Sequence, residues 1–246
     1  VLGAHPDREP RLIGPYTHET SFHEPFVLFG FLAAHTQRIG LVTGIIILPQ
    51  RQTALVAKQA AEVDILSGGR LRLGIGTGWN YVEYDALNED FHNRGKRQEE
   101  QVTLLRKLWA EPVVDFTGKW HRIDRAGLKP LPNRRIPIWF GGNNEQVFKR
   151  AARLGDGLIP QFLPNDAGRA TLERIDGYLA SHGRSRAEFG IEAQVNFGAG
   201  PEKWASHADA WRVLGANYVC VRTMNAGLET PQEHIDAIRR YKAEVG

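Results

Sequence analysis

Several classes of protein depend on residue types that are scarce in this sequence, and the first of these is cysteine. Its single cysteine, Cys220, excludes a disulfide bond within the chain, and with it the disulfide-stapled scaffold of small secreted domains. The cysteine stands in the apolar run YVCV (218–221), so we expect a buried small side chain in a protein of the reducing cytoplasm. No stretch of about 18 apolar residues occurs, which predicts a chain without a membrane-spanning helix.

Concentrated charge and metal-ligand clusters are also missing. The formal net charge is +3, and lysine and arginine are spread along the chain instead of forming the basic stripe that nucleic acids select. The nine histidines are scattered without a closely spaced pair of metal ligands. We therefore expect neither a nucleic-acid partner nor a metal site.

Short β-rich runs alternate with amphipathic windows along most of the chain, a pattern typical of a parallel sheet with helical crossovers. The predicted strands are 38–48, 70–76, 136–140, 157–162, 189–197 and 217–222. Apolar stripes at helical spacing fall in 102–109, 147–154, 172–179, 204–211 and 235–245. The motif TPQE (230–233) predicts a capping box at the start of the last helix.

This order of elements predicts the α/β fold class, as a single (β/α)8 barrel domain over residues 1–246. Six predicted strands are two fewer than the barrel needs, so we expect a β-α-β segment upstream of Val1, with residues 1–4 leaving its second strand. The segment 26–34 is apolar on every side, which predicts a fully buried helix or half of a homodimer interface.

Acids and bases are scarce where the predicted strands end, which is where parallel α/β folds place their chemistry. The ends read TGIIILP (43–49), GTGWN (76–80), GGNN (141–144), PQF (160–162), NFGAG (196–200) and RTMNAG (222–227). They lack the paired carboxyl groups of a glycosidase and the oxygen or imidazole ligands of a metal enzyme. The chain also lacks the G-x-S-x-G motif of serine nucleophiles.

Glycine and amide side chains at these ends favour a large bound cofactor that carries the reactive chemistry itself. Gly141 and Gly142 would let the backbone approach a phosphate group closely, and the helix expected from Glu145 points its free N–H groups at the same place. The alternative is a glycine-rich turn in which Asn144 only caps the helix.

The stretch LRLGIGTGWNY (71–81) raises the question of a dinucleotide-binding turn, which needs G-x-G-x-x-G at the opening of a helix. Gly74 and Gly76 match the first two glycines, but Trp79 occupies the place of the third. Residues 81–95 offer no apolar helix face. We therefore interpret the stretch as a strand that runs into a cofactor pocket.

Four ordered motifs are HTQRIGLVTGIIILPQRQTALVAKQAAEVDILSGGRLRLGIGTGW (35–79), FHNRGKRQEE (91–100), IPIWFGGNN (136–144) and RAARLGDG (150–157), followed by the weaker RTMNAGL (222–228). Together they resemble the bacterial luciferase-like oxidoreductases, a superfamily of (β/α)8 barrels. The resemblance implies a flavin or deazaflavin lying across the carboxyl ends of the strands.

The resemblance also implies site residues. A non-proline cis peptide is expected at Thr43, Gly44 and Ile45, where it would form a bulge behind the ring. Gly76, Thr77, Gly78 and Trp79 are expected to line the ring or the ribityl chain, and Gly141, Gly142, Asn143 and Asn144 to hold the phosphate. The segment 91–100 either covers the pocket or presents a solvated charged face. No catalytic acid or base is assigned, because the family's acidic residue and histidine at the second strand end have no counterpart here.

Two reactions share this scaffold. The residues TGIIILP and FGGNN slightly favour hydride transfer with the deazaflavin coenzyme F(420). The alternative is an FMN-dependent monooxygenase that receives its reduced flavin from a separate flavin reductase. Either would act on a small-molecule substrate that the sequence does not identify. A non-catalytic flavin-binding protein on the same fold is a further alternative, whereas a phosphate-sugar isomerase or aldolase barrel would need a lysine or carboxylate at a strand end.

Overall fold

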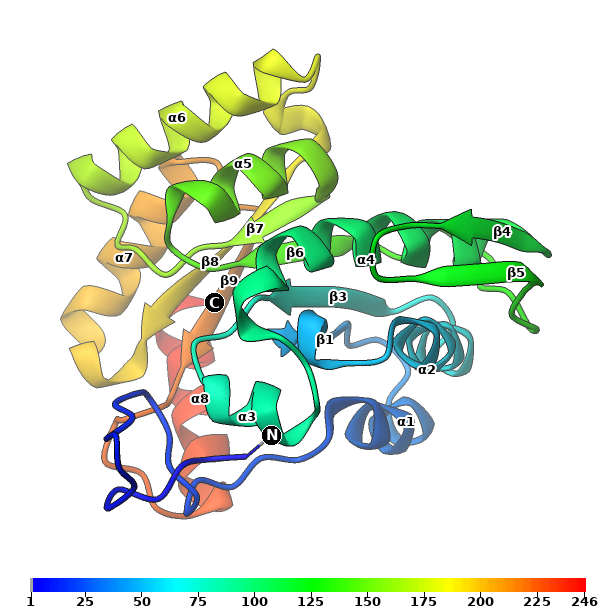
Figure 1. The fold of residues 1–246 in the computed structure, drawn as a ribbon. Helices are drawn as coiled ribbons and strands as arrows, with labels where there is room; N and C mark the ends of the chain where they lie inside the picture. Colours follow the sequence, from blue (N-terminus) through cyan, green and yellow to red (C-terminus); the bar gives the residue numbers. More distant parts are fainter. Residues whose placement is uncertain (1) are drawn as a thin grey trace. The chain divides into compact units, whose positions relative to one another are not determined.

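The computed structural model describes residues 2–246, and the chain divides into two compact units, Val1–Ile138 and Trp139–Gly246. Figure 1 shows the chain with most of its helices and strands labelled. The expected exit of residues 1–4 from a strand includes Val1, which lies outside the described residues, and residues 2–5 have no regular secondary structure.

The first unit is built on β3 (Leu71–Gly76), whose alternating Leu71, Leu73 and Ile75 are at most 1% exposed. Two short strands, β1 (Leu41–Val42) and β2 (Ile46–Ile47), pair with it in parallel. The single strand predicted over 38–48 is therefore broken in the middle, and the break lies at Thr43, Gly44 and Ile45.

The helices of the first unit are α1 (Pro25–His35), α2 (Thr53–Leu66), α3 (Tyr81–Ala86) and α4 (Arg94–Ala110), with 3-10 turns η1 (Leu48–Gln50) and η2 (Phe91–Asn93). The stripe Val102, Leu105 and Trp109 of α4 is buried, as predicted. Helix α1 buries one face through Phe26 and Phe29, whereas Val27 and Phe31 are 73% and 62% exposed. It is therefore not fully buried in this chain.

A two-stranded antiparallel hairpin, β4 (Val114–Thr117) and β5 (Arg122–Ala126), follows α4 and was missed by the sequence analysis. It is the green hairpin labelled in Figure 1. Most of its side chains are exposed, so the hairpin has almost no apolar pattern from which it could be recognised.

The second unit contains four parallel strands in the order β6 (Ile138–Gly141), β7 (Gly157–Ile159), β8 (Gly190–Asn196) and β9 (Tyr218–Arg222). Its helices are α5 (Glu145–Leu154), α6 (Asp166–Ser181), α7 (Pro201–Val213) and α8 (Pro231–Val245), with 3-10 turns η3 (Arg186–Glu188) and η4 (Phe197–Ala199). Alternating parallel strands and helices in both units confirm the α/β fold class.

Two features of the second unit differ from the sequence prediction, and one agrees with it. Cys220 is exposed instead of buried, because its strand β9 carries exposed residues on both faces. The stripe of α8 is also open, with Ile235 44% and Ile238 48% exposed. The capping box is confirmed: the hydroxyl of Thr230 accepts the N–H of Glu233, whose carboxylate accepts the N–H of Thr230.

Among residues 2–246, every helix is too short or too polar to cross a lipid bilayer.

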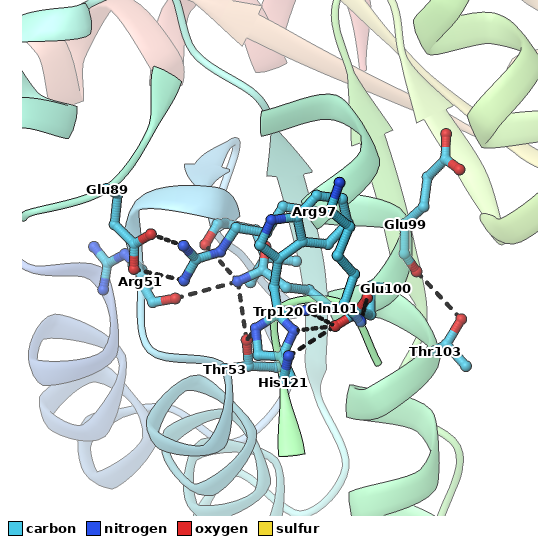
Figure 2. A network of polar contacts seen from close by, with 12 residues as sticks. Arg51, Thr53, Glu89, Arg97, Glu99, Glu100, Gln101, Thr103, Trp120 and His121 are labelled. Atoms are coloured by element: carbon cyan, nitrogen blue, oxygen red, sulfur yellow. Dashed lines mark hydrogen bonds and ion pairs between the residues drawn. The ribbon is translucent and has the colours of Figure 1, made fainter. Parts of the chain in front are cut away.

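A buried polar network fastens the hairpin to the helices beside it (Figure 2). One carboxylate, that of Glu100 in α4, accepts the backbone N–H groups of Lys119, Trp120 and His121 at 2.7–2.9 Å. It also lies 2.8 Å from Nδ1 of His121, whose Nε2 lies 2.7 Å from Oγ1 of Thr53 at the start of α2. The side chains of Glu100 and His121 are only 13% and 11% exposed, so the charges of segment 91–100 do not form a wholly solvated face.

Replacing Glu100 by glutamine is expected to lower the free energy of unfolding at pH 7 by about 1–3 kcal/mol, because buried N–H groups lose their charged acceptor. Burial by itself would raise the pKa of Glu100, but the N–H of Trp120 and the imidazole of His121 outweigh it and hold the pKa below its ordinary value. The stabilisation is therefore fully present above the unfolded pKa of about 4.3 and is lost as the pH falls through the folded pKa.

Urea unfolding of the wild type and Glu100→Gln at pH 7 and pH 3 measures this effect. We expect the difference in unfolding free energy to shrink at the lower pH. Glu111→Gln is the control, since Glu111 is 43% exposed in a surface ion pair with Lys107 and should change stability by less than about 1 kcal/mol at pH 7. An undiminished difference at pH 3 would show that Glu100 does not act through its charge.

Candidate functional site

The predicted residues of the first unit lie along β2 and β3. Gly76, the last residue of β3, pairs with Ile47 of β2, and Thr77, Gly78 and Trp79 follow directly. Thr43, Gly44 and Ile45 form the break between β1 and β2, against the middle of the same strand. Both predicted groups therefore lie along β3.

The break is a β-bulge. Val42 pairs with Arg72 and Ile46 with Ile75, so four steps along the first strand oppose three along β3. The hydroxyl of Thr43 fills the gap in the ladder: its Oγ1 accepts the N–H of Gly74 and donates to the carbonyl oxygen of Gly74, both at 2.8 Å. Thr43 therefore holds the bulge in place, and its hydroxyl is already used within the sheet.

The predicted cis peptide at residues 43–45 is wrong. Within the described residues the cis bonds are Glu9–Pro10 and Lys129–Pro130, and the bulge turns instead through Gly44, whose φ is +60°. Glycine adopts this region without steric cost, whereas a non-proline cis bond costs about 2.5–4 kcal/mol. A Cβ added to Gly44 would meet nothing within 4 Å, so the backbone there faces open space.

Gly78 has the opposite surroundings. Its φ is +68°, and a Cβ built on it would lie 2.9 Å from Cγ2 of Ile47. A side chain at residue 78 would thus be both strained and in contact with β2. The glycine lets the chain turn sharply over the end of the neighbouring strand.

Trp79 packs under the amino-terminal segment of the chain. Its ring lies 5.1 Å from that of Tyr16 in an edge arrangement, and a Cβ on Gly14 would come within 1.8 Å of the indole. The segment before α1 therefore covers part of the strand end that the resemblance assigned to the cofactor. Tyr16 and Gly14 were not among the predicted residues.

A buried carboxylate at this end of β3 was also missed. Glu83, in the first turn of α3, is 1% exposed and accepts hydrogen bonds from Nε2 of Gln50 and the N–H of Leu2, both at 2.8 Å. The hydroxyl of Tyr16 donates to it at 3.3 Å. Burial, and then the charge of Glu83, raise the pKa of Tyr16 to about 12, so the phenol stays protonated near neutral pH and serves as a donor.

The predicted phosphate site lies in the second unit, between β6 and α5. Gly141 ends β6, Gly142 has φ +142°, and Asn143 and Asn144 lead into the helix. Oδ1 of Asn144 accepts the N–H of Val147 at 3.0 Å, so Asn144 caps the helix as the alternative interpretation predicted. This cap does not exclude a bound anion, because a helix has further free N–H groups in its first turn.

The chemistry around this turn fits an anion. The carboxylate of Glu145, which would repel one, is engaged by the hydroxyl of Tyr178 and lies 3.6 Å from Nε of Arg174. The helix N-terminus carries a partial positive charge of about half a unit. Gly141, Gly142, Asn143 and Asn144 could therefore hold a phosphate group.

Thr53, His121 and Glu100 form a hydroxyl–imidazole–carboxylate series, shown in Figure 2, that the sequence analysis missed. Such a series activates a nucleophile when the hydroxyl can reach a substrate. Thr53 is 3% exposed, and its Oγ1 also accepts the amide of Gln101 at 2.9 Å. The arrangement therefore fastens the hairpin and does not present a reactive hydroxyl.

Residues 2–246 contain no group of three or more histidine, cysteine, aspartate or glutamate side chains that could hold a metal ion. The candidate site is thus made of backbone, glycine and aromatic surfaces with one buried carboxylate. A surface of this composition suits a ligand that carries the reactive group itself.

Several known proteins are similar to this chain in sequence or in fold. The chain is 35% identical over 158 residues to the F(420)-dependent glucose-6-phosphate dehydrogenase of Mycobacterium avium, covering 59% of this chain and 45% of that protein. It is 34% identical over 176 residues to the FMNH(2)-dependent dimethylsulfone monooxygenase of Pseudomonas fluorescens, covering 70% and 48%. The chain thus spans about half the length of these relatives.

A solved structure shows the same fold. Monooxygenase RslO1 from Streptomyces bottropensis superposes with a TM-score of 0.75 over 92% of this chain and 85% of that one, at 19% identity. The family model described as luciferase-like monooxygenase matches residues 12–245. The chain therefore belongs to the luciferase-like monooxygenase family.

Proposed function

We propose that this chain binds a reduced flavin-type cofactor along the carboxyl end of β3 and takes part in hydride transfer with coenzyme F(420). The observation that carries the proposal is the bulge at Gly44, where a positive φ leaves the backbone facing open space beside the carboxyl half of β3. Membership of the luciferase-like family supports it, as does the 35% identity to an F(420)-dependent dehydrogenase.

The residues of the site would bind and orient the ring and exclude water. Gly44 and Gly78 would present backbone without side chains, and Trp79 with Tyr16 would form an apolar wall. The protonated phenol of Tyr16 would stay a hydrogen-bond donor, held by Glu83. When bound, F(420) supplies a hydride carrier whose ring has carbon at position five and so forms no hydroperoxide with oxygen. In the second unit, taken by itself, Gly141, Gly142, Asn143 and Asn144 would hold a phosphate group.

An FMN-dependent monooxygenase is the second candidate, favoured by the 34% identity to the FMNH(2)-dependent dimethylsulfone monooxygenase. Reduced FMN supplies oxygen activation, and a separate flavin reductase would be the partner that delivers it. Both reactions use a small-molecule substrate and the same glycine-lined backbone, so the cofactor distinguishes them.

Titration with FMN and with F(420), followed by absorbance and fluorescence quenching, tests the choice of cofactor. We expect saturable binding of F(420) with weaker binding of FMN, because hydride transfer is the proposed reaction. Tighter binding of FMN would favour the monooxygenase. Saturable binding of neither cofactor would contradict the proposed function.

Gly44→Asn tests where the ring lies. Asparagine tolerates a positive φ, so the variant should fold while its side chain enters the space beside the bulge. We expect at least about a tenfold loss of cofactor affinity, equal to about 1.4 kcal/mol. Gly68→Asn is the matched control, since Gly68 has φ +69° and equally open surroundings just beyond the other end of β3, after α2. Equal affinities in both variants would place the ring elsewhere.

A homodimer formed through α1 is the proposed assembly, because Val27 and Phe31 leave an apolar face exposed on that helix. Sedimentation should show a dimer for the wild type and a shift toward monomer for Phe31→Glu, which puts a charge into the interface. Val213→Glu is the control, as Val213 is also an exposed apolar residue, at the end of α7. A monomeric wild type would contradict the prediction.

A further inference from the structure

Two of the strand ends in the sequence, NFGAG and RTMNAG, have no part in the proposed cofactor site. They follow β8 and β9, which pair in parallel within the second unit, with Asn196 opposite Arg222 (Figure 1). A Cβ on Gly198 would lie 3.6 Å from Cα of Ala226, so the two loops beyond these ends also lie together. The ends of β8 and β9 therefore form one place in the second unit.

Alternate residues of these strands share one face of the sheet. The register places Gly157 of β7 opposite Gly190 and Glu192 opposite Tyr218, and residues opposite one another point to the same side. The indole of Trp139 lies over this side, because a Cβ on Gly157 or Gly190 would come within 2.5 or 2.3 Å of it. We call this side the Trp139 face. From β8 and β9 it carries Glu192, Gln194, Asn196, Tyr218, Cys220 and Arg222.

The Trp139 face is aromatic at one end and polar at the other. Near the amino ends of the strands, the ring of Trp139 lies 5.9 Å from the ring of Tyr218, and Trp139 is 5% exposed. Toward the carboxyl ends of β8 and β9 stand Gln194, Asn196 and Arg222, of which the last two are exposed. The opposite face of β8 is closed, since its residues Ile191, Ala193 and Val195 are all 0% exposed.

The polar groups at this carboxyl end have no partners within the protein. Over residues 2–246, the side chains of Gln194, Asn196 and Arg222 form no hydrogen bond or ion pair. Asn196 precedes the turn η4 without capping it through its side chain. Other arginines of the second unit, by contrast, are engaged by carboxylates or carbonyl oxygens: Arg174, Arg184, Arg186, Arg212, Arg239 and Arg240.

The three free groups are close enough to contact one ligand. Asn196 and Arg222 are on neighbouring strands, about 4.8 Å apart, and Gln194 is two residues or roughly 7 Å before Asn196. A guanidinium presents a planar fork of N–H donors that matches the oxygens of a carboxylate or phosphate group, and an amide adds further donors. Glu192, the carboxylate that β8 places on the same face, is opposite Tyr218, four residues or roughly 13 Å before Arg222. It is therefore too distant to pair with the arginine.

We propose that Arg222, together with the amides of Gln194 and Asn196, binds an anionic oxygen group of the small-molecule substrate, either a carboxylate or a phosphate. The guanidinium fork takes two oxygens of the group, and the amides donate to the same group. The assignment to a substrate rests on the proposed function. Binding of an anion by these three side chains does not, because none of them belongs to the proposed cofactor site.

Isothermal titration calorimetry with benzoate and with phenyl phosphate, in the absence of cofactor, tests the binding. We expect saturable binding of at least one probe and no binding of benzamide, which keeps the ring but lacks the charge. Arg222→Gln should weaken that probe by about tenfold or more, as expected for loss of a charged hydrogen-bond donor. Absence of saturable binding of both probes would overturn the proposal, as would equal affinity for benzamide.

Arg169→Gln is the matched control. Arg169 is exposed on α6 and, in the described part of the chain, its side chain likewise has no partner, so the variant removes the same charge elsewhere in the second unit. We expect it to bind the probe as the wild type does. Equal affinities in Arg222→Gln and Arg169→Gln, with folding confirmed by circular dichroism, would overturn the site.

Titration of Arg222→Gln with F(420) and with FMN separates a substrate from a cofactor as the source of the anionic group. We expect the affinity for the cofactor to stay that of the wild type. A tenfold loss of cofactor affinity would show that Arg222 binds an anionic group of the cofactor, and would overturn its assignment to the substrate. Wild-type protein that binds the probe but neither cofactor would contradict the proposed function and still support the anion site.

Discussion

The carboxyl end of β3 depends on the buried carboxylate of Glu83. A buried charge is tolerated only where several donors surround it, since an unpaired one costs several kcal/mol. Glu83 is surrounded by the amide of Gln50, the N–H of Leu2 and the phenol of Tyr16. These donors come from the amino-terminal segment and from the turn after β2, so the carboxylate of Glu83 holds both of them against helix α3, which carries it.

The two ends of β3 are built on different principles. In the carboxyl half of β3 the pairing with the neighbouring strand is interrupted at Gly44, and Thr43 replaces the missing ladder contacts through Gly74. Backbone without side chains is thereby exposed, which suits a large planar cofactor. At the amino end, Asp64 and Arg134 form a charged contact that fixes the entry of the strand.

Most of the correct predictions about the fold came from local sequence patterns. The order of strands and helices follows from hydrophobic periodicity, and the stripe of α4 and the capping box at Thr230 are confirmed because each depends on residues within a few positions of one another. The β4–β5 hairpin was missed because its strands are mostly exposed. The exposure of Cys220 was missed for a related reason: an apolar run shows which residues favour burial, and not whether another element covers them.

The sequence by itself determined the fold class, the family and the places where glycine leaves the backbone bare, because these are written in short motifs and in local spacing. Only the tertiary structure decided that Thr43 bonds Gly74, 31 positions away, that Gln50 bonds Glu83, 33 positions away, and that Arg134 reaches Asp64, 70 positions away. Contacts of this kind depend on the path of the folded chain. They become strongly favourable only when burial removes water from both partners, and the local sequence around each partner does not show whether it will be buried against the other.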